Sequence, residues 1–363
     1  MSSTPWWTAA SAPVSAEHVV VAADSLRAYL TDVFARAGMS DADAATEATV
    51  LVQADLRGVG SHGIASAPRY VERLQNGVCN PRPNLQVVRE TGVSAVLDAD
   101  HALGQIASVR GMEIAIAKAR QHGIGAVAVR NSSHNGMLAS YAMMALEHDL
   151  IGMTTCNSPT SMPAVGSRSA SIGNNPVAFA IPAGRHAPIV VDIATSVAAR
   201  SKILIAMKRG LPIPPGWAVD VDGNPTEDAQ RAWEGLLFPL AGHKGFGLAM
   251  VFEVLSGVLS GGPFAALLTP VADTTSNRLV SHFFLAMDPA MFLDVSEFTA
   301  RVDELIDLVK ASDRVDGVTE VLVPGERGAR LEAQRRHEGI PLTPTVAGEL
   351  RALGQGLGVQ APF

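Results

Sequence analysis

The chain has 363 residues, of which 47% are hydrophobic and 17% are charged, so it is long enough to form two domains with a well-buried core. Its net charge of −7 and isoelectric point near 5.8 argue against a nucleic-acid-binding surface, which needs a basic stripe. Its two cysteines, Cys79 and Cys156, imply no disulfide framework and favour a reducing compartment.

The N-terminal stretch MSSTPWWTAASAPVS has no cationic start followed by an apolar run, so it resembles neither a signal peptide nor a membrane anchor. We expect residues 1–15 to form a flexible polar arm. No apolar run reaches the roughly 18 to 20 residues that a membrane-spanning helix needs. These features predict a soluble, cytoplasmic protein.

The first predicted elements are helices. Apolar residues recur at helical spacing over residues 16–37. Ser40 is the predicted N-cap of a second helix that runs to about Arg57, with Asp43 three residues after the cap. The turn-rich residues 76–84 follow.

Strands and helices alternate after this turn. Strands are predicted at 93–100, 124–130, 151–156, 176–182, 188–194 and 282–288. Helices are predicted at 104–123, 136–148, 196–209 and 244–262, and again after residue 295. The pattern predicts an α/β (α+β) fold in which residues 16–85 and 295–363 form one helical domain and residues 86–294 form an α/β domain.

Three histidines lie in turns rich in glycine and serine, namely His62 in SHG, His134 in NSSHNG and His243 in AGHKG. Histidine, whose usual pKa is about 6.5, suits proton exchange with a substrate near neutral pH. A surface or capping role is the alternative for each of them.

A metal site and a serine hydrolase are both disfavoured. The sequence contains no HExxH or CxxC pattern for zinc. The loop at 220–228 has its glycine in the fourth position and Arg231 in the twelfth, so it does not fit a calcium-binding loop. VGSRSAS, at 165–171, does not match the GxSxG nucleophile turn. We therefore expect no metal.

HKGFGLAM, at 243–250, would place glycines and Lys244 at the start of a helix. Free N–H groups and the helix dipole favour a phosphate at such a position. The segment does not match GxGxxG, and close helix packing by glycine is the alternative. The residues alone therefore indicate an α/β enzyme and leave a phosphate-bearing cofactor open.

Seven segments together resemble the malate/L-lactate dehydrogenase family of the second type, whose fold is unrelated to the Rossmann lactate dehydrogenases. They are residues 54–64, 129–136, 156–182, 188–203, 211–228, 239–250 and 323–328, in the family's order. The resemblance implies a homodimeric oxidoreductase that uses NAD or NADP, with a helical domain packed on a non-Rossmann α/β cofactor-binding domain. It implies hydride transfer between the nicotinamide and C2 of a small 2-oxo or 2-hydroxy acid. The alternative, from another branch of the family, is reduction of cyclic imino acids such as piperideine-2-carboxylate or pyrroline-2-carboxylate.

The resemblance also implies site residues. His62 and His134 match catalytic histidines, and members of the family divide the proton-transfer role between them. The implied cofactor-binding residues are Ser158, Asp192, Ile193, Ala194, Thr195, His243, Lys244, Gly325, Glu326 and Arg327. The implied substrate-binding residues are Ser61, Ser66, Arg69 and Lys244. A non-catalytic, ligand-binding member and a structural protein are the alternatives from other classes.

The chain departs from the family pattern in two places. Ser66 replaces an arginine that is expected to bind a substrate carboxylate, which predicts poor use of dicarboxylates. The loop at 265–277 also differs from the family's loop. Separately, Arg327 favours NADP slightly, because an arginine can bind a 2′-phosphate, although the neighbouring Glu326 would favour the free ribose of NAD.

Overall fold

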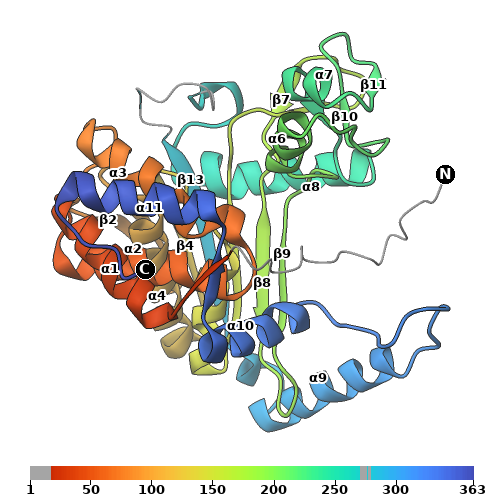
Figure 1. Cartoon of the computed structure of the whole chain (residues 1–363). Coiled ribbons are helices and arrows are strands. Elements are labelled where there is room, and N and C mark those ends of the chain that lie inside the picture. Colours follow the sequence, from red (N-terminus) through yellow and green to blue (C-terminus); the bar gives the residue numbers. More distant parts are fainter. Residues whose placement is uncertain (1–17, 270–275, 277–278) are drawn as a thin grey trace.

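The computed structural model describes residues 18–269, 276 and 279–363 (Figure 1). The predicted arm at 1–15 and part of the loop at 265–277 lie outside the described residues. The described chain contains eleven α-helices and a seven-stranded mixed sheet, which confirms the predicted α/β fold. No helix in these ranges is both long enough and apolar enough to cross a membrane.

The central sheet has the strand order β2-β3-β4-β13-β5-β8-β9. Its strands are β2 (Gln86–Glu90), β3 (Ser94–Asp98), β4 (Ile124–Ser132), β13 (Val280–Met287), β5 (Ile151–Cys156), β8 (Val177–Ile181) and β9 (Ile189–Ile193). Among its neighbouring pairs in the described chain, β3 and β4 run parallel and the others antiparallel. The fold is therefore not the parallel sheet of a Rossmann domain.

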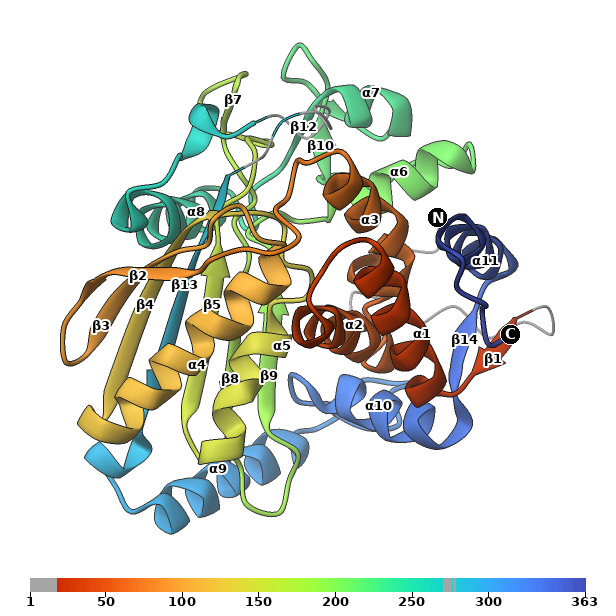
Figure 2. The same cartoon turned by 90° about the vertical axis from the view of Figure 1, so that its left-hand side faces the viewer.

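The helix α4 (Gly104–His122) connects β3 to β4 and lies with α5 (Ala139–Ala142) across the sheet (Figure 2). Its packing on the sheet is close, because a Cβ added at Gly111 would lie 2.7 Å from Cδ2 of Phe284. It ends at Gly123, whose φ of 82° is a conformation that glycine adopts without steric cost. Both the helix and its end agree with the prediction.

Helices from the two ends of the chain form a layer beside the sheet (Figure 2). They are α1 (Ala23–Arg36), α2 (Asp41–Leu56), α3 (Ala67–Gln75), α10 (Glu326–Glu338) and α11 (Pro344–Leu357), which contact one another through α1–α2, α2–α10, α1–α11 and α3–α11. The antiparallel pair β1 (Val19–Val21) and β14 (Ile340–Leu342) ties the two chain ends together. The cap of α2 is the predicted one, since the Asp43 N–H donates to Ser40 Oγ at 3.2 Å.

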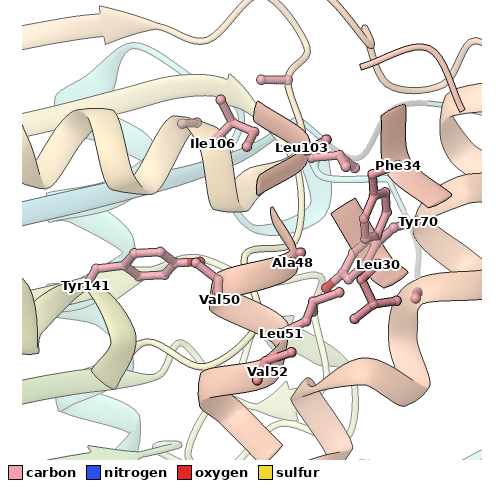
Figure 3. Close-up of a cluster of buried hydrophobic side chains, with 14 of the residues drawn as sticks. Leu30, Phe34, Ala48, Val50, Leu51, Val52, Tyr70, Leu103, Ile106 and Tyr141 are labelled. Atoms are coloured by element: carbon pink, nitrogen blue, oxygen red, sulfur yellow. The ribbon is translucent and has the colours of Figure 1, made fainter. Parts of the chain in front are cut away.

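The core around α2 holds large apolar side chains from several of these helices. Figure 3 shows Leu30 and Phe34 of α1, Tyr70 of α3, and Leu103 and Ile106 at the start of α4 in this cluster. Burying each such side chain stabilises the fold by about 1.5 to 3 kcal/mol. The core therefore fixes α2, α3 and the start of α4 relative to one another.

The helix α9 (Val295–Lys310) lies apart from this layer, against the turn that joins β8 to β9 (Figure 1). Its Asp303 accepts backbone N–H bonds from Gly184, Arg185 and His186 in that turn. The division of the chain into residues 16–85 with 295–363 and residues 86–294 stays a prediction.

Several short elements differ from the prediction. The segment at 16–37 contains β1 before α1, and β2 was not predicted. The remaining short elements are β6 (Met162–Pro163), β7 (Ala170–Ile172), β10 (Ala218–Val219), β11 (Pro225–Thr226), α7 (Ala229–Glu234) and β12 (Leu236–Leu237). The predicted helix at 196–209 is shorter, as α6 (Arg200–Lys208). The helix at 136–148 divides into α5 and a 3-10 segment, and that at 244–262 divides into α8 (His243–Glu253) and a π-helical turn.

Candidate active site

The structure brings two of the predicted histidines together. His62 ends a 3-10 turn (Gly60–His62) that follows α2, and His134 lies in the turn that follows β4. Their ring centroids are 5.7 Å apart, and the ring planes differ by 21°. Two turns that are distant in the sequence therefore present neighbouring imidazoles.

A buried carboxylate holds the turn that carries His62. Asp55, near the end of α2 and 9% exposed, accepts the Ile64 N–H at 2.6 Å through Oδ2. A Cβ added at Gly63 would lie 1.9 Å from the same oxygen, so the turn needs glycine there. Burial raises the pKa of Asp55 to about 7, against the opposing effects of the Ile64 N–H and the Arg335 charge. Asp55 was not predicted as a functional residue, although it lies in a segment that matches the family.

We expect the contribution of Asp55 to the free energy of unfolding to fall as the pH rises from about 4 to about 7. The pKa is about 7 in the folded protein and about 3.9 in an unfolded chain. Between these values the folded state binds more protons than the unfolded state, so stability decreases with increasing pH. Chemical unfolding should therefore show a larger advantage of wild type over Asp55→Asn at pH 5 than at pH 8. Equal differences at the two pH values would contradict this expectation.

The turn that carries His134 packs directly on the start of α4. The Gly104 N–H donates to Ser133 Oγ at 3.0 Å. A Cβ added at Gly104 would lie 2.3 Å from the carbonyl oxygen of Ser133 and 2.5 Å from that of His134. On the other side, Tyr70 Oη lies 2.7 Å from Nδ1 of His134. These contacts fix the position of the ring.

The predicted substrate-binding residues other than Lys244 lie on the turn of His62 and on α3. Ser61 is exposed, and its Oγ lies 2.9 Å from Nδ1 of His62. Ser66, which precedes α3, is 7% exposed. Arg69 is exposed on α3, and its guanidinium carbon lies 5.4 Å from the centroid of the Tyr70 ring. Burial, and then the Arg69 charge, lower the pKa of His62. Near neutral pH, His62 is therefore a neutral imidazole that can accept a proton.

A second group of predicted residues begins at the end of β9. Asp192 Oδ2 accepts the Ala139 N–H at 2.9 Å, which links β9 to the helix that follows the His134 turn. Part of Asp192 is exposed, but the surrounding protein desolvates its carboxyl group and thereby raises its pKa to about 6. The N–H bonds from Ala139 and Leu138 lower the pKa and only partly offset this effect. Ile193 is exposed and Ala194 half-buried, whereas Thr195 is buried and its Oγ1 has no hydrogen-bond partner in the described chain.

Ser158 lies in a network of asparagines that was not predicted from the sequence. Its N–H donates to Asn175 Oδ1 at 2.9 Å and its Oγ donates to Asn174 Oδ1 at 3.0 Å. Asn175 Nδ2 donates to Glu253 of α8 at 2.6 Å, and Asn157 Nδ2 donates to the same carboxylate at 3.1 Å. One signal was present, since Glu253 is the single acidic residue in an apolar helical segment at 244–262.

The start of α8 packs against Thr195. The Leu240 N–H donates to the Thr195 carbonyl at 2.8 Å, and a Cβ added at Gly245 would lie 2.6 Å from that carbonyl. His243 and Lys244 are exposed in the first turn of α8, whose N-cap, Gly242, supplies no side-chain cap. The positive end of the helix dipole, the Lys244 cation and the Thr195 hydroxyl, unpartnered in the described chain, fit a phosphate-bearing cofactor.

The predicted segment Gly325 to Arg327 lies beside β9. The Val190 N–H donates to the Pro324 carbonyl at 3.1 Å, and a Cβ added at Gly325 would lie 2.7 Å from Val190 N. Arg327 is exposed. Glu326 is engaged elsewhere, because each of its carboxylate oxygens accepts a hydrogen bond from Lys310 Nζ at 2.8 Å and Arg330 also pairs with it. Burial raises the pKa of Glu326, but the bonds from Lys310, the Val323 N–H and Arg330 outweigh this and hold it below its usual value.

The structure therefore gathers the predicted residues in two groups linked by α5. One contains the two histidines with Ser61, Ser66 and Arg69, and the other contains the residues around β9 and the start of α8. Within the described ranges, no group of three or more histidine, cysteine, aspartate or glutamate side chains is arranged to hold a metal ion.

Comparisons with known proteins identify the family of the chain. Residues 21–351 match the malate/L-lactate dehydrogenase family. The chain is 35% identical to L-sulfolactate dehydrogenase of Methanocaldococcus jannaschii, over 94% of this chain and 98% of the relative, and the solved sulfolactate dehydrogenase structure from this organism matches with a TM-score of 0.88 over the same shares. It is 33% identical to ureidoglycolate dehydrogenase (NAD(+)) of Escherichia coli O157:H7, over 90% of this chain and 93% of the relative.

A third similar protein is Δ1-piperideine-2-carboxylate reductase of Pseudomonas syringae. Its solved structure matches with a TM-score of 0.84 at 28% identity, covering 92% of this chain and 99% of that chain. The matches extend over nearly the full length of each protein. The chain therefore belongs to the malate/L-lactate dehydrogenase family, a family of oxidoreductases.

Proposed function

We propose that this protein is an NAD- or NADP-dependent oxidoreductase that transfers a hydride between the nicotinamide and C2 of a small 2-oxo or 2-hydroxy acid. The observation that carries the proposal is the pair of imidazoles of His62 and His134, 5.7 Å apart. The Asp192 hydrogen bond to Ala139 links this pair to the residues that fit a cofactor. Reduction of a cyclic imino acid is the second candidate, supported by the likeness to Δ1-piperideine-2-carboxylate reductase.

The bound nicotinamide would supply or accept the hydride. The chain's own residues would move the proton, since a neutral His62 can take it from the substrate hydroxyl in oxidation. Asp55 would keep His62 in place through its bond to the Ile64 N–H, at 2.6 Å. Arg69, exposed beside the histidines, would provide a cation for the substrate carboxylate.

The cofactor would bind along β9 and the start of α8. Lys244 and the uncapped first turn of α8 would face the phosphates, and Asp192 would accept bonds from ribose hydroxyls. We propose a modest preference for NADP, because Arg327 is exposed while Glu326 is paired with Lys310 and Arg330. The likeness to a ureidoglycolate dehydrogenase named for NAD(+) favours NAD instead.

Steady-state kinetics with a panel of 2-oxo acids and cyclic imines, each tested with NADH and NADPH, would test the proposal. Oxidation of either cofactor by a member of the panel is the expected result, with a higher kcat/KM for NADPH. A preference for NADH of about tenfold or more, some 1.4 kcal/mol, would contradict the cofactor preference. If no compound is reduced, and neither cofactor raises the melting temperature, the proposed activity is wrong.

We expect higher activity on monocarboxylates than on malate or oxaloacetate. A dicarboxylate needs cations at both ends, and Ser66, the N-cap of α3, replaces the family arginine, which leaves Arg69 in the first turn of that helix. The variant Ser66→Arg should improve kcat/KM for dicarboxylates relative to monocarboxylates by about 1 to 3 kcal/mol, the value of a charge-assisted hydrogen bond. Ser66→Ala is the matched control and should not change this ratio. A wild-type kcat/KM that is highest for malate or oxaloacetate would contradict the prediction.

We further propose that the protein acts as a homodimer in the cytoplasm. The helix α8 and the π-helical turn after it expose a row of apolar side chains, which supports an interface with a second copy. These side chains are Leu248, Val251, Val254, Val258 and Leu259. Light scattering of the purified protein should give twice the mass of the chain.

A further inference from the structure

A buried tyrosine contacts one histidine of the pair. Tyr70 of α3 is fully buried in the hydrophobic core, yet its hydroxyl oxygen lies 2.7 Å from Nδ1 of His134. The ring centroids of Tyr70 and His134 are 6.2 Å apart with planes 26° apart, and His134 also stacks on His62. His134 is therefore the common neighbour of a tyrosine in the core and a histidine in the site.

The direction of the Tyr70 bond follows from a second contact to the same nitrogen. The Gly136 N–H points at Nδ1 of His134 across 3.4 Å. A backbone N–H can only donate, so Nδ1 must carry a lone pair and not a proton. The Tyr70 hydroxyl is then the donor to Nδ1, and the neutral ring must carry its proton on Nε2.

The surroundings keep the Tyr70 hydroxyl protonated. Burial raises its pKa to about 12, although the Arg69 guanidinium 5.4 Å from its ring centroid opposes this. Glu47 of α2 acts on Tyr70 in the same direction as burial, and it is itself fully buried with no hydrogen-bond partner in the described chain. Burial also raises the pKa of Glu47 well above its usual value.

We propose that Tyr70 is a positioning residue that fixes the tautomer of His134, so that the ring presents an Nε2–H bond donor to the substrate. The proposal rests on the proposed function and assigns different tasks to the two histidines. His134 would donate a hydrogen bond to the substrate oxygen or imine nitrogen, and His62 would exchange the proton.

The tautomer can be read without substrate, from ¹⁵N-labelled protein by long-range ¹H–¹⁵N correlation of the imidazole nitrogens. His134→Asn identifies the His134 signals by their loss. In wild-type protein Nδ1 should show the shift of an unprotonated nitrogen and Nε2 that of a protonated one. Protonated Nδ1 in the neutral ring would overturn the proposal, whatever the enzyme assays give.

Tyr70→Phe keeps the buried ring and removes only the hydroxyl. We expect mixed tautomers at His134 and a fall in kcat of about 10- to 100-fold with KM changed less than about threefold. Tyr29→Phe is the matched control, because this buried hydroxyl bonds to the Leu350 carbonyl in the helical layer, and it should leave both readings unchanged. Wild-type kcat and unchanged His134 signals in Tyr70→Phe would refute the proposal. If Tyr70→Phe does not fold, the tautomer of His134 in the wild-type protein decides whether the proposal is right. A wild-type protein that shows this tautomer but no turnover would refute the proposed function and not the role of Tyr70.

Discussion

Replacing either His62 or His134 with asparagine is expected to lower kcat by at least about 100-fold, the usual contribution of general acid–base catalysis. Asparagine at position 62 cannot exchange a proton near neutral pH, and the shorter asparagine side chain at position 134 cannot place a donor where Nε2 of His134 lies. The two rings lie 5.7 Å apart, so both can reach one substrate. Steady-state rates with the best substrate of the panel measure the effect.

The control for both variants is His337→Asn, which changes an exposed histidine in the last turn of α10. This variant should retain wild-type kcat. Thermal unfolding of all three variants separates loss of chemistry from loss of fold. If His62→Asn and His134→Asn both turn over at the wild-type rate, the histidine pair has no part in the reaction.

Replacing Glu253 with alanine is expected to destabilise the fold by about 2 to 4 kcal/mol, because buried donors lose a charged acceptor. Glu253 is 4% exposed and accepts bonds from Asn157, Asn175 and the Ala265 N–H. Asn175 in turn accepts the Ser158 N–H, so its displacement would also disturb a predicted cofactor contact. Chemical unfolding and the KM for the cofactor measure the two consequences, and we expect KM to rise.

Glu113→Ala is the matched control on α4. Glu113 and its partner Arg110 are both about half exposed, and such a pair contributes at most about 1 kcal/mol. The control should therefore unfold near the wild-type midpoint with an unchanged KM. Equal stability and equal KM in the two variants would show that the asparagine network does not support the cofactor site.

The sequence predicts those parts of the fold that local chemistry determines. Ser40 caps α2 as expected, because an N-cap hydroxyl needs only the backbone three residues later. Gly123 ends α4 as expected, because a positive φ is a local requirement. Short strands such as β1 could not be predicted, because Val19–Val21 is stabilised by pairing with Ile340–Leu342 at the other end of the chain.

The candidate site divides in the same way. Glycine-flanked histidines and the matched segments pointed to His62 and His134, but no local pattern predicts that their rings stack. Tyr70 falls on an apolar helix face and looks like an ordinary core residue, and only the fold places its hydroxyl on His134. Asp55 and Glu253 are similar cases, because each acts through groups that the chain brings together in space.

The pairing of β1 with β14 has a consequence for how this chain is made. A ribosome makes Val19–Val21 long before it makes their partners, Ile340–Leu342. The apolar faces of α1 and α3 that α11 covers stay uncovered until α11 has been made. Contacts between such distant residues form slowly, and the waiting surface is open to aggregation. A nascent chain that stops before β14 would hold a sheet with an unfinished helical layer, which is a target for chaperones and proteases.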